Sequence, residues 1–227
     1  MSRSNLHHKN KDIGINVDDS YRKQLKNGAD NLGQPLSEEE QEKLLTFVQL
    51  IIKWNKTHNL TAITETKAII SKHLLDSLSV SPYLYGQSIL DVGTGAGLPG
   101  IPLAILNPNK AFTLLDSSQK RIAFINEVKR KLALTNVTTK HCRVEQYSGP
   151  KFSSICSRAY SSLEQMLAQT EHLIDKSGVW LAMKGVYPQA EVDRLLNRFQ
   201  VKRAISLSVP ELAAERHLLM IEKKDIS

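Results

Sequence analysis

The second half of the chain alternates between two hydrophobic patterns. Short runs rich in Val, Ile, Leu and Phe predict β-strands at residues 88–92, 111–115, 137–142, 152–156, 179–183, 201–208 and 217–222. Between them, apolar residues recur at helical spacing, which predicts helices at 99–106, 118–134, 163–174 and 188–199. Strands that alternate with helices form a mostly parallel sheet, because each right-handed crossover returns the chain to the same edge.

The last two predicted strands break this alternation. Only residues 209–216 separate them, which is too short for a helical crossover and suits a loop between antiparallel strands. Dinucleotide-binding sheets normally continue with further strand–helix units, whereas an antiparallel final pair is typical of methyltransferase sheets. We therefore predict a doubly wound, Rossmann-like α/β fold of the methyltransferase type, mostly parallel with an antiparallel last strand.

The first part of the chain is expected to be helical. Residues 1–16 lack periodicity and are expected to form a flexible tail, residues 17–86 a helical extension, and residues 87–227 the sheet domain. Within the extension, Ser37 and Glu40 form the capping-box pattern that begins a helix. Apolar residues at helical spacing follow there and again in the stretch 66–78.

Composition limits the partners and the compartment. The chain of 227 residues carries a formal net charge of +7, which favours an anionic partner, nucleic acid above all. No apolar stretch approaches the length of a membrane span, and the first ten residues lack a signal-peptide core, so we expect a cytoplasmic protein without membrane association. Cys142 and Cys156 are not in a metal-ligand spacing, so we expect buried free thiols and no metal.

The chain's strongest chemical signal lies at residues 88–100. An apolar strand ending in Asp91-Val92 runs directly into glycines at positions 93, 95, 97 and 100. Glycine allows a tight turn and the close approach of a ligand, and a helix that starts there is expected to present unpaired N–H groups. Such a strand, turn and helix bind nucleotide-like ligands in α/β sheets.

Two ligands compete for this turn. Gly95-x-Gly97-x-x-Gly100, with Asp116 about twenty residues downstream, satisfies the dinucleotide fingerprint. The same stretch begins with Asp91-x-Gly93, which resembles the first motif of S-adenosylmethionine (SAM)-dependent methyltransferases. A turn without a ligand is the third possibility. The antiparallel last strand favours SAM.

Three strand ends carry further candidate groups. Asp116 ends the second strand, where a carboxylate can accept both ribose hydroxyls or cap the next helix. After the third strand, Glu145 can take the amine of adenine while Val144 borders the ring, although the residues alone favour an exposed Arg/Glu pair. Arg158 follows the fourth strand and needs an anion, either the SAM carboxylate, a nucleic-acid phosphate or a structural partner.

Basic residues accompany these strand ends. Arg143, Lys184, Arg216 and His217 would place positive charge around one rim and neutralise phosphates, although each alone also fits a solvated surface charge. His73 and Asp76 lie three residues apart in a predicted helix. They form either a hydrogen-bonded or acid/base pair, or the histidine packs at the junction with the sheet.

Several blocks resemble one known family, in the order in which that family has them. They are Lys-Trp-Asn-Lys-Thr-His-Asn-Leu-Thr (53–61), Lys-His-Leu-Leu-Asp-Ser (72–77), Asp-Val-Gly-Thr-Gly-Ala-Gly-Leu-Pro-Gly-Ile-Pro (91–102), Leu-Leu-Asp-Ser (114–117), Ser-Arg-Ala (157–159) and Lys-Gly (184–185). They resemble the bacterial 16S (small-subunit) ribosomal RNA guanine-N7 methyltransferases, also called glucose-inhibited division protein B, over roughly residues 36–223. The family often has arginine where this chain has Lys72, which keeps the charge but not the bidentate geometry.

The resemblance implies a cofactor, a substrate and a set of contacts. It implies SAM binding by Gly93, Leu98, the pair Val144 and Glu145, and Arg158, beside the turn residue Gly95. The implied substrate is a guanine of 16S rRNA in a small ribosomal subunit, and we expect a monomer.

The implied chemistry needs few protein groups. Guanine N7 carries a free lone pair and no proton, so no general base and no catalytic residue is expected; alignment and the exclusion of water suffice. The alternatives are a small-molecule SAM methyltransferase, an NAD-dependent oxidoreductase, and a non-catalytic RNA-binding module.

Overall fold

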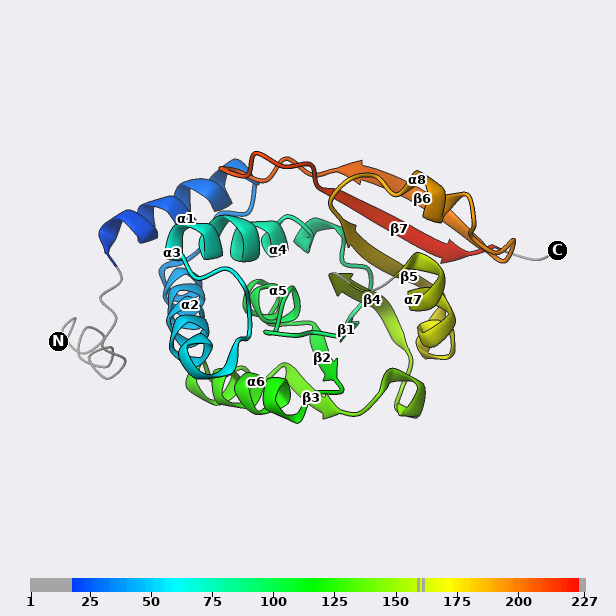
Figure 1. The fold of residues 1–227 in the computed structure, drawn as a ribbon, viewed down its shortest axis with the longest axis horizontal. Coiled ribbons are helices and arrows are strands. Elements are labelled where there is room, and N and C mark those ends of the chain that lie inside the picture. The colour runs from blue at the N-terminus through cyan, green and yellow to red at the C-terminus, as the bar shows by residue number, and fades with distance from the viewer. Residues whose placement is uncertain (1–17, 159, 161, 225–227) are drawn as a thin grey trace.

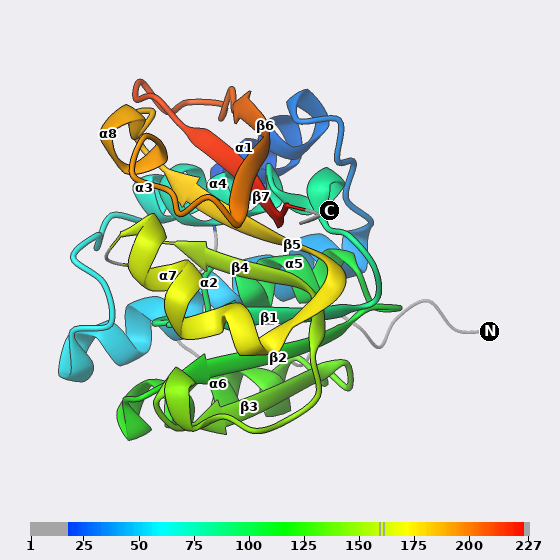
Figure 2. The same cartoon turned by 90° about the vertical axis from the view of Figure 1, so that its right-hand side faces the viewer.

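The protein is built around one seven-stranded sheet, described by a computed structural model over residues 18–158, 160 and 162–224. Its strands are β1 (Ser88–Val92), β2 (Ala111–Asp116), β3 (Val137–His141), β4 (Phe152–Arg158), β5 (Ile174–Lys184), β6 (Phe199–Ser206) and β7 (His217–Lys223). They lie in the order β3-β2-β1-β4-β5-β7-β6, and only β7 runs antiparallel to its neighbours (Figures 1 and 2). The predicted fold class is confirmed.

Helices cover both faces of the sheet. The N-terminal part contains α1 (Asp19–Asn31), α2 (Glu38–His58), α3 (Thr66–Ile69), the π-helix η2 (Ile70–Leu75), α4 (Asp76–Leu78) and the 3₁₀ turn η3 (Ser81–Tyr83). Within and after the sheet come α5 (Gly100–Leu106), α6 (Gln119–Lys131), η4 (Val144–Gln146), α7 (Leu163–Thr170), η5 (Glu171–Leu173) and α8 (Gln189–Val192). The predicted capping box is confirmed, because Ser37 N–H donates to Glu40 Oε2 at 2.7 Å and Glu40 N–H donates to Ser37 Oγ at 3.2 Å.

Two predicted helices are wrong in extent. The stretch 188–199 forms only the single turn α8, and Phe199 begins β6 instead, where its ring packs edge-on against Trp180 at 5.5 Å between centroids. Leu196 stays 42% exposed, so this segment lacks the continuous buried face that stabilises a short helix. The predicted helix 163–174 ends at Thr170, and Ile174 belongs to β5, which is longer than the predicted strand 179–183.

Smaller differences complete the comparison. The strand predicted at 201–208 lies at Phe199–Ser206. Cys156 is buried, and burial raises the pKa of its thiol, whereas Cys142 is only half buried, so the expectation for Cys142 is wrong. The predicted tail, residues 1–16, lies outside the described residues. Within the described ranges, no helix is long and apolar enough to cross a membrane.

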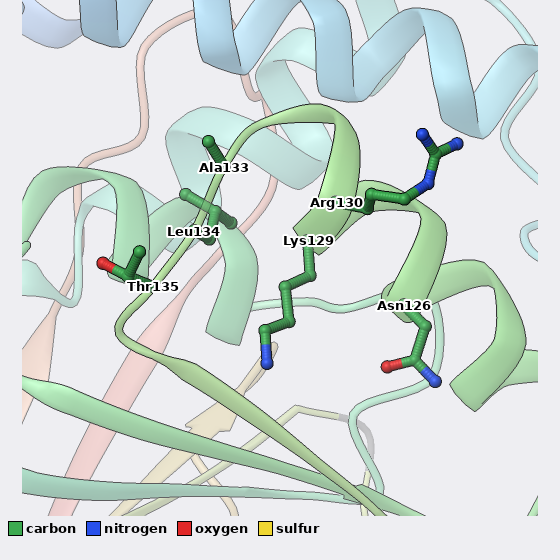
Figure 3. A pocket seen from close by; sticks show the side chains of 6 residues that line it. All are labelled: Asn126, Lys129, Arg130, Ala133, Leu134 and Thr135. Carbon is green, nitrogen blue, oxygen red and sulfur yellow. The ribbon is translucent and has the colours of Figure 1, made fainter.

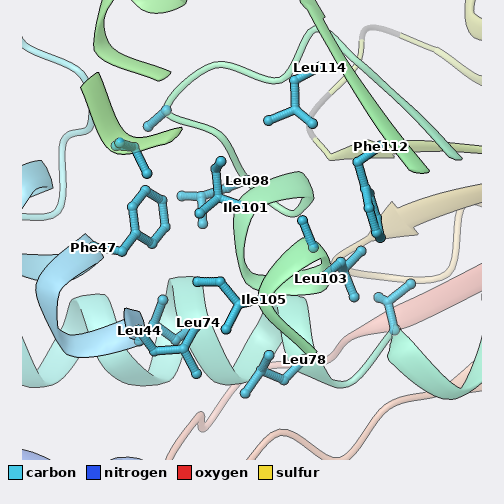
Figure 4. Close-up of a cluster of buried hydrophobic side chains, with 14 of the residues drawn as sticks. Leu44, Phe47, Leu74, Leu78, Leu98, Ile101, Leu103, Ile105, Phe112 and Leu114 are labelled. Atoms are coloured by element: carbon cyan, nitrogen blue, oxygen red, sulfur yellow. The ribbon is translucent and has the colours of Figure 1, made fainter. Parts of the chain in front are cut away.

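The core forms two layers because strand residues alternate between the faces. Leu114 points into a cluster with α2, α5 and α6, whereas Leu115 points into a cluster with α7. In the larger layer, Phe47 and Leu74 of the N-terminal helices pack with Ile101 of α5 (Figure 4). This cluster contains residues from both sides of position 86, where the helical extension was predicted to end. The extension therefore shares a core with the sheet and helps to position the strand ends on which the site is built.

Candidate functional site

The glycine turn after β1 takes the conformation that its sequence predicts. Gly93, Gly95 and Gly97 have φ angles of +65°, +59° and +79°, a region that side chains disfavour. At Gly97 a Cβ would lie 2.7 Å from Cγ1 of Ile101, and at Gly93 it would lie 3.4 Å from the ring of Tyr160. The turn therefore needs glycine both for backbone conformation and for the approach of its neighbours.

The start of helix α5 does not offer the unpaired N–H groups that the sequence led us to expect. Gly100 N–H donates to Oδ2 of Asp91 at 2.9 Å, and Ile101 N–H donates to the carbonyl of Gly97 at 2.8 Å. Positions 99 and 102 are prolines, which have no N–H. A dinucleotide places its pyrophosphate on such donors, so this turn lacks what the NAD hypothesis requires.

Asp91 is a fully buried carboxylate beneath the turn. Its Oδ2 also accepts from the hydroxyl of Thr94 at 2.6 Å, while Oδ1 has no hydrogen-bond partner among the described residues. Burial raises the pKa of Asp91 to about 6. With Asp116 and Glu145 nearby in the fold, the surroundings of the turn are rich in carboxylates, which suits a cationic, hydroxyl-bearing ligand such as a sulfonium nucleoside better than a pyrophosphate.

Asp116 fastens the glycine turn to the end of β2. Its Oδ2 accepts from Gly95 N–H at 2.9 Å, and its Oδ1 accepts from Ser118 N–H at 2.9 Å. Arg121 lies 3.3 Å from Oδ2, and the Asp116 side chain is buried. The structure brings the two predicted site residues Gly95 and Asp116 together, while a ribose contact of Asp116 stays a prediction.

Glu145 reaches the turn through two residues that sequence reasoning missed. Gln169 of α7 donates through Nε2 to Glu145 Oε1 at 2.6 Å, and its Oε1 accepts from the hydroxyl of Tyr160. The ring of Tyr160 lies against Gly93. Glu145, Gln169 and Tyr160 therefore link the end of β3 to the turn after β1. No sequence pattern marks Gln169, because it is an ordinary polar position of a helix.

Leu98 and Val144 contribute side chains to the core rather than to an open site. Leu98 is 4% exposed in the cluster of the N-terminal helices, and Val144 is 5% exposed in the cluster of α7. Any contact of Leu98 with a ligand would have to come from its backbone.

Arg158 is held by the N-terminal helices. Its Nη1 lies 3.5 Å from Oδ2 of Asp76, donates to the carbonyl of Lys72 at 3.2 Å, and lies 3.1 Å from Nδ1 of His73. The other oxygen of Asp76 accepts from Nε of Arg216 at 3.0 Å. One buried carboxylate thus serves two guanidinium groups. Burial raises the pKa of Asp76, and both arginines oppose that rise.

His73 and Asp76 do not form the pair considered from the sequence. Nε2 of His73 lies 2.9 Å from the hydroxyl of Thr61, and Nδ1 faces Arg158. Burial, then the charge of Arg158, lowers the pKa of His73 to about 4, so its ring is neutral at physiological pH. The histidine packs at the junction between the helices and the sheet, as the second alternative had it.

The four RNA-contact candidates fall into two places. Lys184 and His217 are paired across β5 and β7, and Arg216 directly precedes β7. Arg143 is exposed beyond β3, at the other end of the sheet order. Three of these groups already have protein partners, and two of the partners are acids: Lys184 lies 2.9 Å from Glu191, and Arg216 binds Asp76. His217 Nδ1 lies 2.8 Å from the carbonyl oxygen of Gly185.

A narrow recess lies at the carboxyl ends of β4 and β5. It is lined by Ser157, Tyr160, Ser162, Leu163, Met166, Ala182, Met183 and Lys184. Ser157 is 2% exposed, and its hydroxyl has no hydrogen-bond partner within the part of the chain that the structure describes. A buried hydroxyl without a partner is costly, which makes Ser157 a candidate for contact with a bound ligand.

A second, open pocket of about 370 Å³ lies elsewhere (Figure 3). It is formed at the C-terminal end of α6 by Asn126, Lys129, Arg130, Ala133, Leu134 and Thr135. Because α6 runs back toward the start of β3, this pocket lies at the opposite edge of the sheet from the glycine turn. Among the described residues, no three His, Cys, Asp or Glu side chains gather as metal ligands would.

Solved structures support the fold. A magnesium protoporphyrin IX methyltransferase from Synechocystis PCC 6803, solved with bound SAM, matches 78% of this chain and 97% of its own at a TM-score of 0.56 and 18% identity. A SAM-dependent methyltransferase from Aquifex aeolicus matches 68% of this chain and 92% of its own at a TM-score of 0.55 and 15% identity.

Sequence comparisons go further. The family model described as GidB, rRNA small subunit methyltransferase G, matches residues 40–219. Proteins named ribosomal RNA small subunit methyltransferase G are similar over most of the chain. The one from Haemophilus ducreyi is 50% identical over 83% of this chain and 93% of its own length. The one from Alteromonas mediterranea is 46% identical over 88% and 95%. The resemblance drawn from the motifs is thus confirmed: this chain belongs to the GidB family of small-subunit rRNA methyltransferases, whose cofactor is S-adenosylmethionine.

Proposed function

We propose that this protein transfers a methyl group from SAM to N7 of a guanine in 16S rRNA. The observation that carries the proposal is the glycine turn itself. It is bordered by the carboxylates Asp91 and Asp116, and the N–H groups at the start of α5 are bonded within the protein. This arrangement fits a sulfonium nucleoside, and it occurs in a chain whose relatives are named as small-subunit rRNA methyltransferases.

The cofactor would be held in this proposal by two glycines, two acids and one arginine, together with the backbone of Leu98 and with Val144 beside the adenine ring. Gly93 and Gly95 let it approach the backbone, Asp116 and Glu145 accept from its hydroxyls and amine, and Arg158 binds its carboxylate. SAM supplies an already activated methyl group when bound. What remains for the protein is to orient the accepting base and to exclude water.

The accepting base needs no proton transfer from this chain. Guanine N7 has a free lone pair, so neither a base nor an acid is required, and the neutral, low-pKa His73 would be a poor acid in any case. We place the edge of the base at the recess, where the hydroxyl of Ser157 lacks a partner. A base presented there must leave its stack, as in other enzymes that modify bases.

The RNA would lie along the rim made by the strand ends. Arg143, Lys184, Arg216 and His217 supply the positive charge in this proposal, and the net charge of +7 supports an anionic substrate. We also propose that the protein acts as a monomer; light scattering of the purified chain measures this directly.

The deciding experiment uses small ribosomal subunits from cells that lack this protein. Incubation with SAM labelled in its methyl group should transfer label to 16S rRNA, and digestion should release it as 7-methylguanosine. Label on another base, on ribosomal protein, or only on small molecules would overturn the proposal. Subunits from cells that contain the protein are the control, since their site is already modified and should accept little label.

A further inference from the structure

A chain of hydrogen bonds leads from helix α2 to the end of β4. Asn55 begins it by clamping the backbone of Thr61: its Nδ2 donates to the Thr61 carbonyl at 2.9 Å, and its Oδ1 accepts from Thr61 N–H at 2.9 Å. The Thr61 hydroxyl, fixed in this way, lies 2.9 Å from Nε2 of His73. A side chain from the N-terminal helices thus determines where the imidazole ring lies.

The far side of the imidazole meets Arg158. Nη1 of Arg158 lies 3.1 Å from Nδ1 of His73. A guanidinium group can only donate, so a hydrogen bond between these two groups requires Nδ1 to accept and places the ring proton on Nε2, facing the hydroxyl of Thr61. The carbonyl of Lys72 lies 3.1 Å from Nδ1 and accepts from Nη1 of Arg158 at 3.2 Å, so the competing tautomer would donate from Nδ1 to this carbonyl. The low pKa of His73 agrees with a ring that keeps an unprotonated nitrogen.

The contacts of Arg158 are one-sided. Lys72, His73 and Asp76 all contact Arg158 through its Nη1, whereas Nε and Nη2 donate no hydrogen bond to any described residue. The planar fork of arginine binds a carboxylate through two parallel N–H groups. Its free edge therefore keeps the geometry that such an anion needs.

We propose that His73 is a positioning residue for Arg158: its neutral, Nε2-protonated ring holds Nη1 and leaves the Nε–Nη2 edge for the carboxylate of the cofactor. This inference rests on the proposed role of Arg158 in SAM binding. The π-helix η2, which carries His73, brings His73 and Asp76 to one nitrogen of Arg158. Single π turns of this kind are frequent at functional sites.

The first test is made on the unmodified protein, and a variant is used only to assign its signals. Nitrogen NMR of the full-length chain with labelled histidine should show, at neutral pH, a His73 ring that is unprotonated at Nδ1 and protonated at Nε2. The His73→Asn variant assigns the signals. A ring protonated at Nδ1, or at both nitrogens, would overturn the proposal, because neither form can accept from Arg158.

The second test is a double-mutant cycle on SAM affinity, measured by calorimetry. His73→Leu should weaken binding about tenfold when Arg158 is present and have no effect in an Arg158→Leu background. His73→Asn keeps an acceptor near the position of Nδ1 and should recover most of the affinity. His172→Leu is the control and should leave the affinity unchanged, because His172 is an exposed histidine of η5 whose Nε2 lies 3.3 Å from the Tyr147 carbonyl and which makes no contact with Arg158.

The outcomes separate this inference from the proposed function. Equal losses from His73→Leu in both backgrounds, or unchanged affinity in Arg158→Leu, would overturn the positioning role even if 16S rRNA is still methylated. Absence of methyl transfer by the unmodified protein would instead overturn the proposed function. Circular dichroism of each variant shows whether the fold is retained, and the NMR test decides the matter for any variant that does not fold.

Discussion

The peptide N–H of Gly95 donates to Oδ2 of Asp116 at 2.9 Å and so ties the turn after β1 to the end of β2. Both oxygens of Asp116 are in use, because Oδ1 accepts from Ser118 N–H. An asparagine at this position would lose one of the two bonds, since its NH₂ group cannot accept.

We therefore expect Asp116→Asn to lower the free energy of unfolding by about 1 kcal/mol and to weaken SAM binding about tenfold. Urea unfolding and calorimetry measure the two effects. Asp193→Asn, which changes an exposed carboxylate that accepts from Gln189 on α8, is the matched control. Unaltered SAM affinity in Asp116→Asn would remove Asp116 from the cofactor site.

Gly93→Ala should abolish most SAM binding while the protein still folds. The added Cβ would lie 3.4 Å from the Tyr160 ring and project where the cofactor is expected. The backbone strain alone costs about 1 kcal/mol. Gly33→Ala measures that strain separately, because Gly33 has φ +67° and no atom within 4 Å of its Cβ position. If both variants bind SAM normally, the turn is not the cofactor site.

Asp91 should leave a signature in the pH dependence of stability. Burial raises its pKa from 3.8 to about 6, so the folded state holds this proton more tightly than the unfolded state. Its contribution is fully present below pH 3.8 and is lost as the pH rises to about 6. The free energy of unfolding of Asp91→Asn, relative to the unmodified protein, should therefore increase over that range, by on the order of 3 kcal/mol.

His73 provides a control of opposite sign for that measurement. Its pKa is lowered from 6.5 to about 4, so its stabilisation is lost as the pH falls through this range. Relative to the unmodified protein, His73→Asn should thus lose stability as the pH rises from about 4 to 6.5. A difference for Asp91→Asn that does not change with pH would mean that folding does not shift the pKa of Asp91.

Ser157→Ala should separate catalysis from stability. The buried hydroxyl of Ser157 has no partner among the described residues, so its removal should leave the free energy of unfolding unchanged or slightly increased. If the hydroxyl binds the accepting base, the rate of methyl transfer should fall about tenfold or more while SAM affinity stays the same. A normal rate would show that the base does not use this recess.

Arg143→Gln should reduce the salt dependence of RNA binding. A guanidinium that contacts one phosphate contributes about one unit to the slope of log affinity against log salt concentration. Arg198→Gln is the control, because Arg198 pairs with Glu171 at the opposite edge of the sheet. An equal slope for Arg143→Gln and the unmodified protein would exclude a phosphate contact at Arg143.

Sequence reasoning located the glycine turn and its neighbour Asp116 because parallel strands end at one edge of a sheet. The pattern of apolar residues predicted the strands. The predicted strands in turn indicated where their carboxyl ends meet, which is where the site residues lie. The same reasoning failed at 188–199, where Val192, Leu195 and Phe199 keep helical spacing. The spacing could not reveal that Phe199 packs on Trp180 as part of β6.

The contacts between distant residues could not be predicted in this way. Asp76 and Arg216 are 140 residues apart, and the bond between them depends on how α4 lies against the start of β7. Likewise, Gln169 meets Glu145 only because α7 packs beside η4. The family motifs include Asn55, Thr61 and His73. A motif does not reveal, however, which side-chain atoms form hydrogen bonds with one another.

The closed start of helix α5 has a consequence for selectivity inside a cell. Nucleotides such as ATP share the adenosine part of SAM and differ from it by a chain of phosphates. The N–H groups of Gly100 and Ile101 already donate to Asp91 and to the Gly97 carbonyl, so they are not free to bind phosphate oxygens. The carboxylates around the turn also repel phosphates. The same hydrogen bonds that fix the turn would thus disfavour nucleotides that carry a phosphate chain.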